Sequence, residues 1–275
     1  MRRDVLSRRL LGTWTGLLLI GLYTPLLVVV AYAFNANARV VTVWGGFTAR
    51  WFGAVLRDSE TLAAVETSFR IALTAAVLSV VLGTLGAVGM RRARRWLTAT
   101  FDGLAYLTLV TPVIVLGIAS LLSYVLVGIP RGATTVALTH TVFDASIVAL
   151  IVRARMATFS ADEEEAAADL GAGRWATFFQ VTLLRLGPAI AAGGLLAFTF
   201  SWDDYVVASF VAGPETTTLP LFIYSQIRFG VSPQLNALAT ITMAVSLLGL
   251  LATALLLRRA VRDPRRTMLT PDGAA

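Results

Sequence analysis

Six apolar blocks, each long enough to cross a lipid bilayer as a helix, occupy most of this chain. A bilayer crossing takes roughly 20 apolar residues, and backbone groups in lipid must be satisfied within each segment, so each block predicts one helix. Only 14% of the residues are charged, whereas a soluble domain carries about a quarter. We therefore expect an all-α membrane protein with one transmembrane domain over residues 12–257. The predicted spans cover residues 12–34, 67–90, 103–127, 133–152, 186–210 and 235–257.

The basic residues are distributed unevenly among the segments that connect these spans. All 23 are arginines, and 17 of them lie in the N-terminal segment, in the loops after the second and fourth spans, and in the C-terminal tail. The positive-inside rule therefore predicts that residues 1–11, the loop 153–185 and the tail 258–275 are cytosolic. Because the arginines follow this topology, the net charge of +7 indicates membrane orientation and not nucleic-acid binding.

The loop between the fourth and fifth spans contains a short acidic helix. Residues 163–165 are glutamates and open a helical run through Leu170, since acidic residues in a first turn complement the helix dipole. Gly171 ends the run, because glycine tolerates the left-handed turn that follows many helices. A second short helix is expected over residues 174–183. From periodicity alone two interpretations stay open: a handle for a cytosolic partner, or an amphipathic loop packed on the bilayer surface.

This segment resembles the Glu-Ala-Ala loop of ABC-importer permeases, which docks on the ATPase subunit. The resemblance lies in Glu165-Ala166-Ala167 followed by Asp169-Leu170-Gly171, between the fourth and fifth of six spans. The family usually carries a further proline where this chain has Arg185, a departure that bears on the geometry of the second helix. The residues that the resemblance assigns to ATPase coupling are Glu164, Glu165, Ala166, Ala167, Asp169, Leu170 and Gly171.

Two stretches beyond the loop resemble one branch of these permeases. Residues 197–210, which read AFTFSWDDYVVASF, and residues 214–240 look like the smaller permease of spermidine/putrescine importers. The resemblance implies a type I ABC-importer permease fold in a bacterial inner membrane, and ATP-driven polyamine import. It also implies a second permease subunit, two ATP-binding subunits, and a periplasmic or lipid-anchored solute-binding protein.

No residue pattern predicts catalysis on the chain itself. Without a lysine, the phosphate-binding Gly-x-x-x-x-Gly-Lys motif cannot be present, and the sequence shows no nucleophile–base pair and no metal-ligand cluster. We therefore expect neither a cofactor nor a metal on this chain, with ATP and Mg²⁺ bound by the partner ATPase.

Charged side chains inside the predicted spans are candidates for the substrate path, since each costs on the order of 3 kcal/mol on insertion scales. His140 and Asp144 lie four residues apart and so share one helix face. They form either a polar face toward the path, where a carboxylate meets a cation, or a His–Asp hydrogen bond buried between helices. The polyamine permeases that the chain resembles tend to have neutral residues around Asp144 and Ser146.

Asp203 and Asp204 are a second candidate pair, near the outer end of the fifth span. Consecutive helical residues point about 100° apart, so both cannot face one cavity unless the helix unwinds. Either they are solvated or cap the following segment, or one of them meets an amine together with Trp202 or Tyr205. Aromatic rings of this kind bind cations through their faces.

The substrate class stays open from these residues. Related importers carry opines, ferric iron, thiamine or phosphonates, although the acids of the predicted path favour a cation. A stand-alone secondary transporter or channel, which would need no ATPase, is the alternative from a different class.

Overall fold

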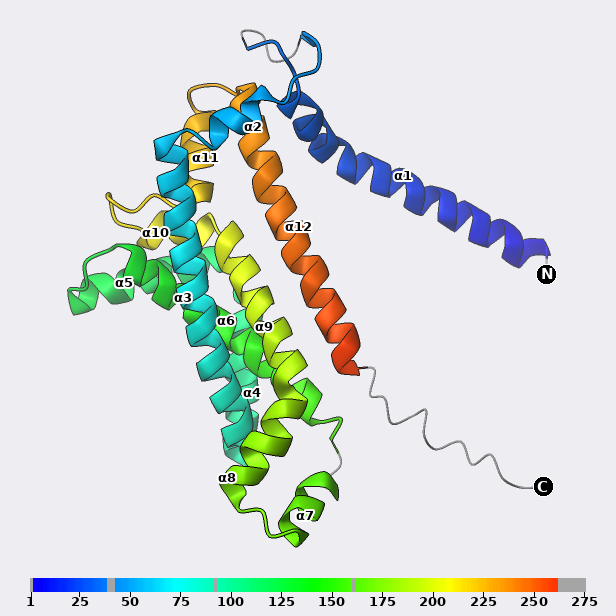
Figure 1. The fold of residues 1–275 in the computed structure, drawn as a ribbon, viewed down its shortest axis with the longest axis vertical. Coiled ribbons are helices and arrows are strands. Elements are labelled where there is room, and N and C mark those ends of the chain that lie inside the picture. Colours follow the sequence, from blue (N-terminus) through cyan, green and yellow to red (C-terminus); the bar gives the residue numbers. More distant parts are fainter. Residues whose placement is uncertain (1, 39–42, 92, 160–161, 262–275) are drawn as a thin grey trace. The chain divides into compact units, whose positions relative to one another are not determined.

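The computed structural model describes residues 2–38, 43–91, 93–159 and 162–261, which are almost entirely helical (Figure 1). Within these residues the only extended pairing is an isolated bridge between Asn35 and Phe47. The chain divides into two compact units, Met1–Ala63 with Phe222–Ala244 and Ala64–Leu221 with Val245–Ala275. The helices are α1 (Arg2–Ala33), α2 (Arg50–Val55), α3 (Ser59–Met90), α4 (Arg95–Val110), α5 (Val113–Val127), α6 (Ala133–Met156), α7 (Asp162–Asp169), α8 (Arg174–Thr177), the π-helical η1 (Phe178–Thr182), α9 (Leu183–Asp203), α10 (Val206–Val211), α11 (Leu219–Ile227) and α12 (Pro233–Val261).

Five helical runs in the described residues are long and apolar enough to cross a bilayer, and a sixth arises if the bent pair α4–α5 counts as one span. The chain is therefore an all-helical, multi-pass membrane protein. The five runs are Leu11–Ala33, Ser59–Met90, Ala133–Met156, Arg174–Asp203 and Pro233–Arg258.

The third predicted span, residues 103–127, is not one continuous helix. α4 ends at Val110, α5 begins at Val113, and their axes are bent by 108°. Pro112 accounts for the break, because proline lacks an N–H and pushes the preceding residue out of the helical region. Thr111 is accordingly extended, with φ −65° and ψ 128°. The bend turns α5 aside, so that it packs against α10.

The fifth predicted span, residues 186–210, begins and ends earlier than expected. The second loop helix, predicted over residues 174–183, does not stand alone, since α8, η1 and α9 form one helical run from Arg174 to Asp203. Neither proline nor glycine interrupts this run before Gly187, so the helix continues out of the loop. At its other end the run stops at Asp203, because Asp204 is extended, with φ −72° and ψ 120°.

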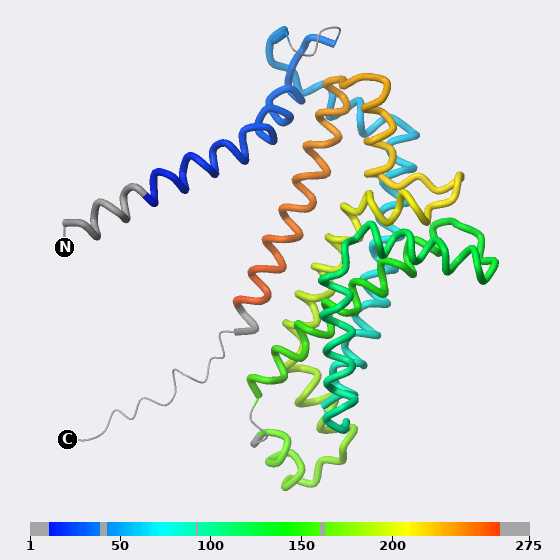
Figure 2. The backbone as a smooth tube through the Cα atoms, turned by 180° about the vertical axis from the view of Figure 1, so that it is seen from behind, coloured from blue at the N-terminus to red at the C-terminus, as the bar shows by residue number. Residues whose placement is uncertain are grey.

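The core of the second unit lies where α6 packs against α9. Small residues permit this close packing. At Gly83 in α3, for example, a Cβ atom would lie 2.6 Å from the carbonyl oxygen of Ala145 in α6. Figures 1 and 2 show α7 and α8 at one end of the α6–α9 pair, and α5 and α10 near the other end. This packing separates two places where polar residues gather.

Candidate functional sites: a polar cavity and a charged loop

A cavity of about 330 Å³ lies inside the second unit, among α4, α5, α6, α9 and α10. It reaches both helix breaks, since its walls include the start of α5 and the residue after α9. The apolar part of its lining is Val113, Leu116, Val142, Phe143, Phe200 and Val207. The polar part is Thr108, Ser120, Tyr124, Thr139, His140, Asp144, Ser201 and Asp204. Two carboxylates and one imidazole are thus the ionisable groups of the cavity besides a tyrosine.

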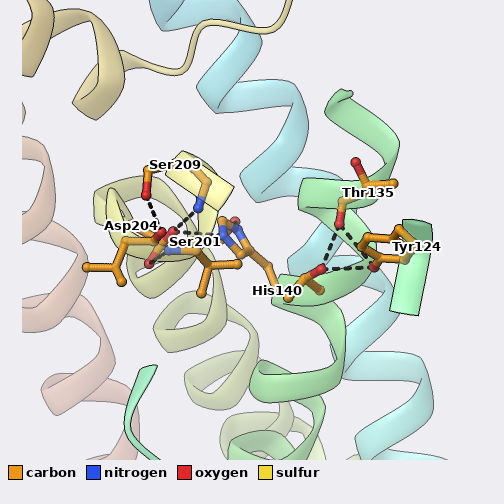
Figure 3. Close-up of polar contacts among 10 residues, drawn as sticks. Tyr124, Thr135, His140, Ser201, Asp204 and Ser209 are labelled. Carbon is orange, nitrogen blue, oxygen red and sulfur yellow. Dashed lines mark hydrogen bonds and ion pairs between the residues drawn. The ribbon is translucent and has the colours of Figure 1, made fainter. Parts of the chain in front are cut away.

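His140 joins α6 to the end of α9 across this cavity (Figure 3). Its Nε2 lies 3.1 Å from Oδ2 of Asp204, and its Nδ1 lies 2.7 Å from Oγ of Ser201. A carboxylate only accepts hydrogen bonds, so Nε2 donates to Asp204, and in the neutral ring Nδ1 accepts from the Ser201 hydroxyl. The histidine therefore makes a buried His–Asp bond, as one sequence interpretation expected, but the residue it bonds is Asp204 and not Asp144.

Asp204 also caps α10, in agreement with one of the two interpretations of the Asp203–Asp204 pair. Its carboxylate accepts from the backbone N–H of Val207 at 3.3 Å and of Ala208 at 2.9 Å. A cap of this kind satisfies backbone donors that have no partner inside the helix. Three N–H groups thus converge on Asp204, which is held in place by them.

Asp144 differs from Asp204 in having no such donors. Only 1% of the residue is exposed, and its Oδ2 is buried without a hydrogen-bond partner. It lines the same cavity as His140 and Asp204. Its position is twelve residues before the end of α6 at Met156, about 18 Å along the helix. The least satisfied ionisable group of the cavity therefore lies in the middle of a membrane-spanning helix.

The other three predicted path residues do not line this cavity. Asp203 is exposed and accepts a hydrogen bond of 2.6 Å from Ser246 in α12. Trp202 is buried and stacks on Phe198, with ring centroids 6.1 Å apart, and Tyr205 is half-buried at the start of α10. The two consecutive aspartates face different surroundings, and because the helix ends between them, the 100° spacing of helical residues does not apply to this pair.

Sequence reasoning missed Ser201, Tyr124 and Thr139, which complete the polar side of the cavity. The Tyr124 hydroxyl lies 2.9 Å from Oγ1 of Thr139 and 3.2 Å from the carbonyl oxygen of Thr135. Thr135 in turn donates to the carbonyl oxygen of Val211, which fastens α6 to α10. The only sequence signal for these residues is a polar side chain within an apolar span, which hydroxyl groups give too often to be decisive.

The acidic loop forms the helix that the sequence predicts, with Glu163 and Glu164 tied to neighbouring helices. Glu163 pairs with Arg185 of α9 at 2.6 Å. Glu164 pairs with Arg91, at the end of α3, and accepts a hydrogen bond of 2.9 Å from Thr182. These contacts fix the start of α7 against α3 and α9.

The far side of α7 is open. Glu165, Ala166 and Asp169 are exposed, Leu170 is 90% exposed, and Ala167 is half-buried. Gly171 ends the helix with φ +82°, as predicted, and the backbone N–H of Ala172 then bonds the carbonyl oxygen of Ala167 at 2.9 Å. Glycine suits this position because the left-handed conformation is energetically costly for a residue with a Cβ atom.

A groove runs beside this loop, between the end of α3 and the start of the α8–α9 run. Its volume is about 590 Å³, and its lining includes Arg91, Glu164, Arg174, Trp175 and Phe178. Trp175 is 77% exposed. The loop therefore offers apolar side chains beside charged ones, of which Arg91 and Glu164 pair with each other.

Comparison with known proteins places these features in a family. Residues 79–263 match the family described as the binding-protein-dependent transport system inner membrane component. The chain is 42% identical to the putrescine transport system permease protein PotI of Escherichia coli K12, over 89% of this chain and 91% of the relative. It is 35% identical to the spermidine/putrescine transport system permease protein PotC of the same organism, over 92% and 96%.

Solved structures share the fold at low sequence identity. A chain from a bacterial ABC transporter involved in the import of the acidic polysaccharide alginate aligns with a TM-score of 0.69 and 17% identity, over 94% of this chain and 98% of that one. A chain from a bacterial alginate ABC transporter, solved in complex with an alginate pentasaccharide-bound periplasmic protein, aligns with a TM-score of 0.60 and 15% identity, over 98% and 97%.

Proposed function

The chain belongs to the family of binding-protein-dependent transport system inner membrane components, and we propose that within it the chain is a permease subunit of an ATP-driven importer for polyamines. Polyamines are the cargo named for its relatives at 42% and 35% identity. The observation on this chain that supports the same cargo is the cavity, whose described lining combines two carboxylates with an apolar wall and contains no arginine. Such a lining suits an aliphatic cation and disfavours an anion such as a phosphonate.

In the proposed topology both termini and the loop 153–185 are cytosolic. The arginine distribution supports this orientation through the positive-inside rule. The acidic helix α7 then lies on the side where ATP is available, and the end of α9 near Asp204 faces the opposite side.

The proposed assembly contains a second permease, two ATP-binding subunits that carry ATP and Mg²⁺, and an external solute-binding protein. An apolar helix such as α1 needs cover from lipid or from other membrane-spanning helices, which a second permease would supply in part. The chain itself is proposed to be non-catalytic, because a protein without lysine has no phosphate-loop lysine for ATP hydrolysis.

The loop is proposed to couple ATP hydrolysis to transport. When the ATPases close, α7 and the exposed Leu170 and Trp175 would move with them. The pairs Glu163–Arg185 and Glu164–Arg91 would pass this motion to α9 and α3 as a rigid body. The cavity between α6 and α9 would then alternate its access between the two sides of the membrane.

Reconstitution of the complete importer in proteoliposomes tests this function. We expect uptake of radiolabelled putrescine or spermidine into the vesicles. This uptake should require ATP inside the vesicles, where the ATP-binding subunits face, and the loaded binding protein outside. Competition by unlabelled thiamine, ferric iron or an opine, but not by polyamines, would reassign the cargo. Uptake that persists with a hydrolysis-deficient ATPase would instead indicate a secondary transporter.

A further inference from the structure

Taking the proposed import of polyamines as its premise, we propose that Asp144 is the residue of the cavity that receives an ammonium group of the substrate. Asp204 would then serve as a positioning residue that holds the cavity wall together. The two carboxylates line one cavity but differ in what already surrounds them.

Saturation of Asp204 is the first reason for this division of roles. Its oxygens accept hydrogen bonds from His140 and from the N–H groups of Val207 and Ala208. The negative charge is therefore largely satisfied by groups of the chain itself, and an ammonium group would have to displace or share those donors.

Asp144 is the acceptor of the cavity that lacks a donor. Its Oδ2 is buried without a hydrogen-bond partner, and only 1% of the residue is exposed. An unpaired buried carboxylate is costly, and a cation that enters the cavity removes that cost by supplying N–H donors and the opposite charge. A bound ammonium ion therefore gains more at Asp144 than at the satisfied Asp204.

The surrounding wall suits the rest of such a molecule. Phe143 and Phe200 contact each other in the cavity lining, with ring centroids 6.4 Å apart, and Val142 continues the apolar surface. Methylene groups of an aliphatic amine can pack on these side chains while the charged end meets Asp144. The cavity thus offers one carboxylate beside an apolar surface, which suits one charged end of a polyamine and the methylene chain next to it.

Asp144→Asn in the reconstituted importer is the direct test, with putrescine as the probe. We expect kcat/KM for uptake to fall at least about 30-fold, since loss of one partner of a buried charge contact costs a few kcal/mol. Assembly with the ATPases and ATP hydrolysis stimulated by the loaded binding protein should persist. Glu66→Gln, the same chemical change on an exposed residue outside the cavity, is the matched control and should import normally.

Moving the charge distinguishes a substrate contact from a structural role. Val113 lines the same cavity and is the first residue of α5, where a carboxylate complements the helix dipole. We expect Asp144→Asn combined with Val113→Asp to recover most of the lost uptake. Failure of Asp144→Asn to assemble, or no recovery in the double variant, would overturn the proposal.

Measuring which substrate the wild-type importer carries shows whether a negative result overturns the role of Asp144 alone or the proposed function as well. If the wild type imports polyamines and Asp144→Asn does so equally well, only the role of Asp144 is overturned. If the wild type imports another cation, the same variants measured with that cation decide the role. If the cargo is neutral or anionic, both proposals fail.

Discussion

The charged loop and the cavity, two regions of the same unit, use carboxylates in opposite ways. In the loop, Glu163 and Glu164 are paired with arginines of α9 and α3. In the cavity, Asp144 is more deeply buried than either glutamate and yet has an oxygen without a donor. Water can satisfy a partly exposed charge but not a buried one, so the unsatisfied group marks where a ligand is expected.

The apolar side chains of the two regions also differ in how far they are exposed to solvent. Leu170 and Trp175 of the loop are largely exposed, at 90% and 77%, whereas Phe143 is half-buried and Phe200 is 42% exposed where they line the cavity. The loop therefore presents exposed apolar side chains beside the paired Glu163 and Glu164, which suits docking of a protein. The cavity presents apolar walls and a carboxyl oxygen of Asp144 without a hydrogen-bond partner, which suits a small organic cation.

The largest expected effect comes from breaking the turn that ends α7. Gly171→Pro cannot adopt φ +82°, because the proline ring holds φ near −65°. We expect uptake to be abolished while the protein stays in the membrane, as measured by transport and by immunoblot of the membrane fraction. Gly171→Asn tolerates the left-handed turn and should retain most uptake, and normal uptake by the proline variant would contradict the coupling role.

A charge reversal on the open side of α7 comes next. Glu165→Arg changes an exposed residue and leaves the pairs of Glu163 and Glu164 in place. We expect loss of uptake together with loss of ATPase co-purification, because the docking surface is altered and the fold is not. If the ATPase still co-purifies and uptake is unchanged, α7 does not dock through this side.

Substitutions of Asp204 distinguish the effect of its charge from the effect of its capping hydrogen bonds. Asp204→Ala should lower the free energy of unfolding by about 1 kcal/mol through loss of the α10 cap. Asp204→Asn keeps a good capping residue and should retain the thermal stability of the wild type in detergent. Equal melting temperatures for all three proteins would show that the cap adds nothing to stability, which would weaken the positioning role.

The smallest expected effect is at the ion pair between Arg91 and Glu164. The side chains are 32% and 19% exposed, so solvent and salt screen the interaction. In a double-mutant cycle with Arg91→Gln and Glu164→Gln, we expect a coupling energy of at most about 1 kcal/mol, which declines at high salt. A much larger, salt-independent value would make the loop resemble the buried cavity and erase the contrast between the two regions.

Features encoded by neighbouring residues could be predicted from the sequence. The acidic helix ending at Gly171 follows from composition and turn chemistry over about ten residues, and the apolar runs follow from hydropathy. The sequence does not show as clearly whether each apolar run forms one continuous helix. A proline inside an apolar span, such as Pro112, predicts a kink, but a bend of 108° depends on α5 packing against α10.

The cavity shows the same limit. Spacing predicted that His140 and Asp144 share a helix face, and both do line the cavity. Spacing could not predict that His140 would turn toward Ser201 and Asp204, which are more than 60 residues away along the chain.

The membrane-spanning helices could be predicted from the amino-acid sequence alone, because hydropathy over roughly 20 residues and the backbone's need for hydrogen bonds in lipid are local constraints. The sequence also predicted where the acidic loop helix begins and ends. Which carboxylate is satisfied and which is not could be seen only once the helices were packed together. Asp204 receives two of its donors from Val207 and Ala208, which follow it closely in the chain. The third donor comes from His140 of α6 and is brought there by packing between helices, whereas no donor reaches Oδ2 of Asp144.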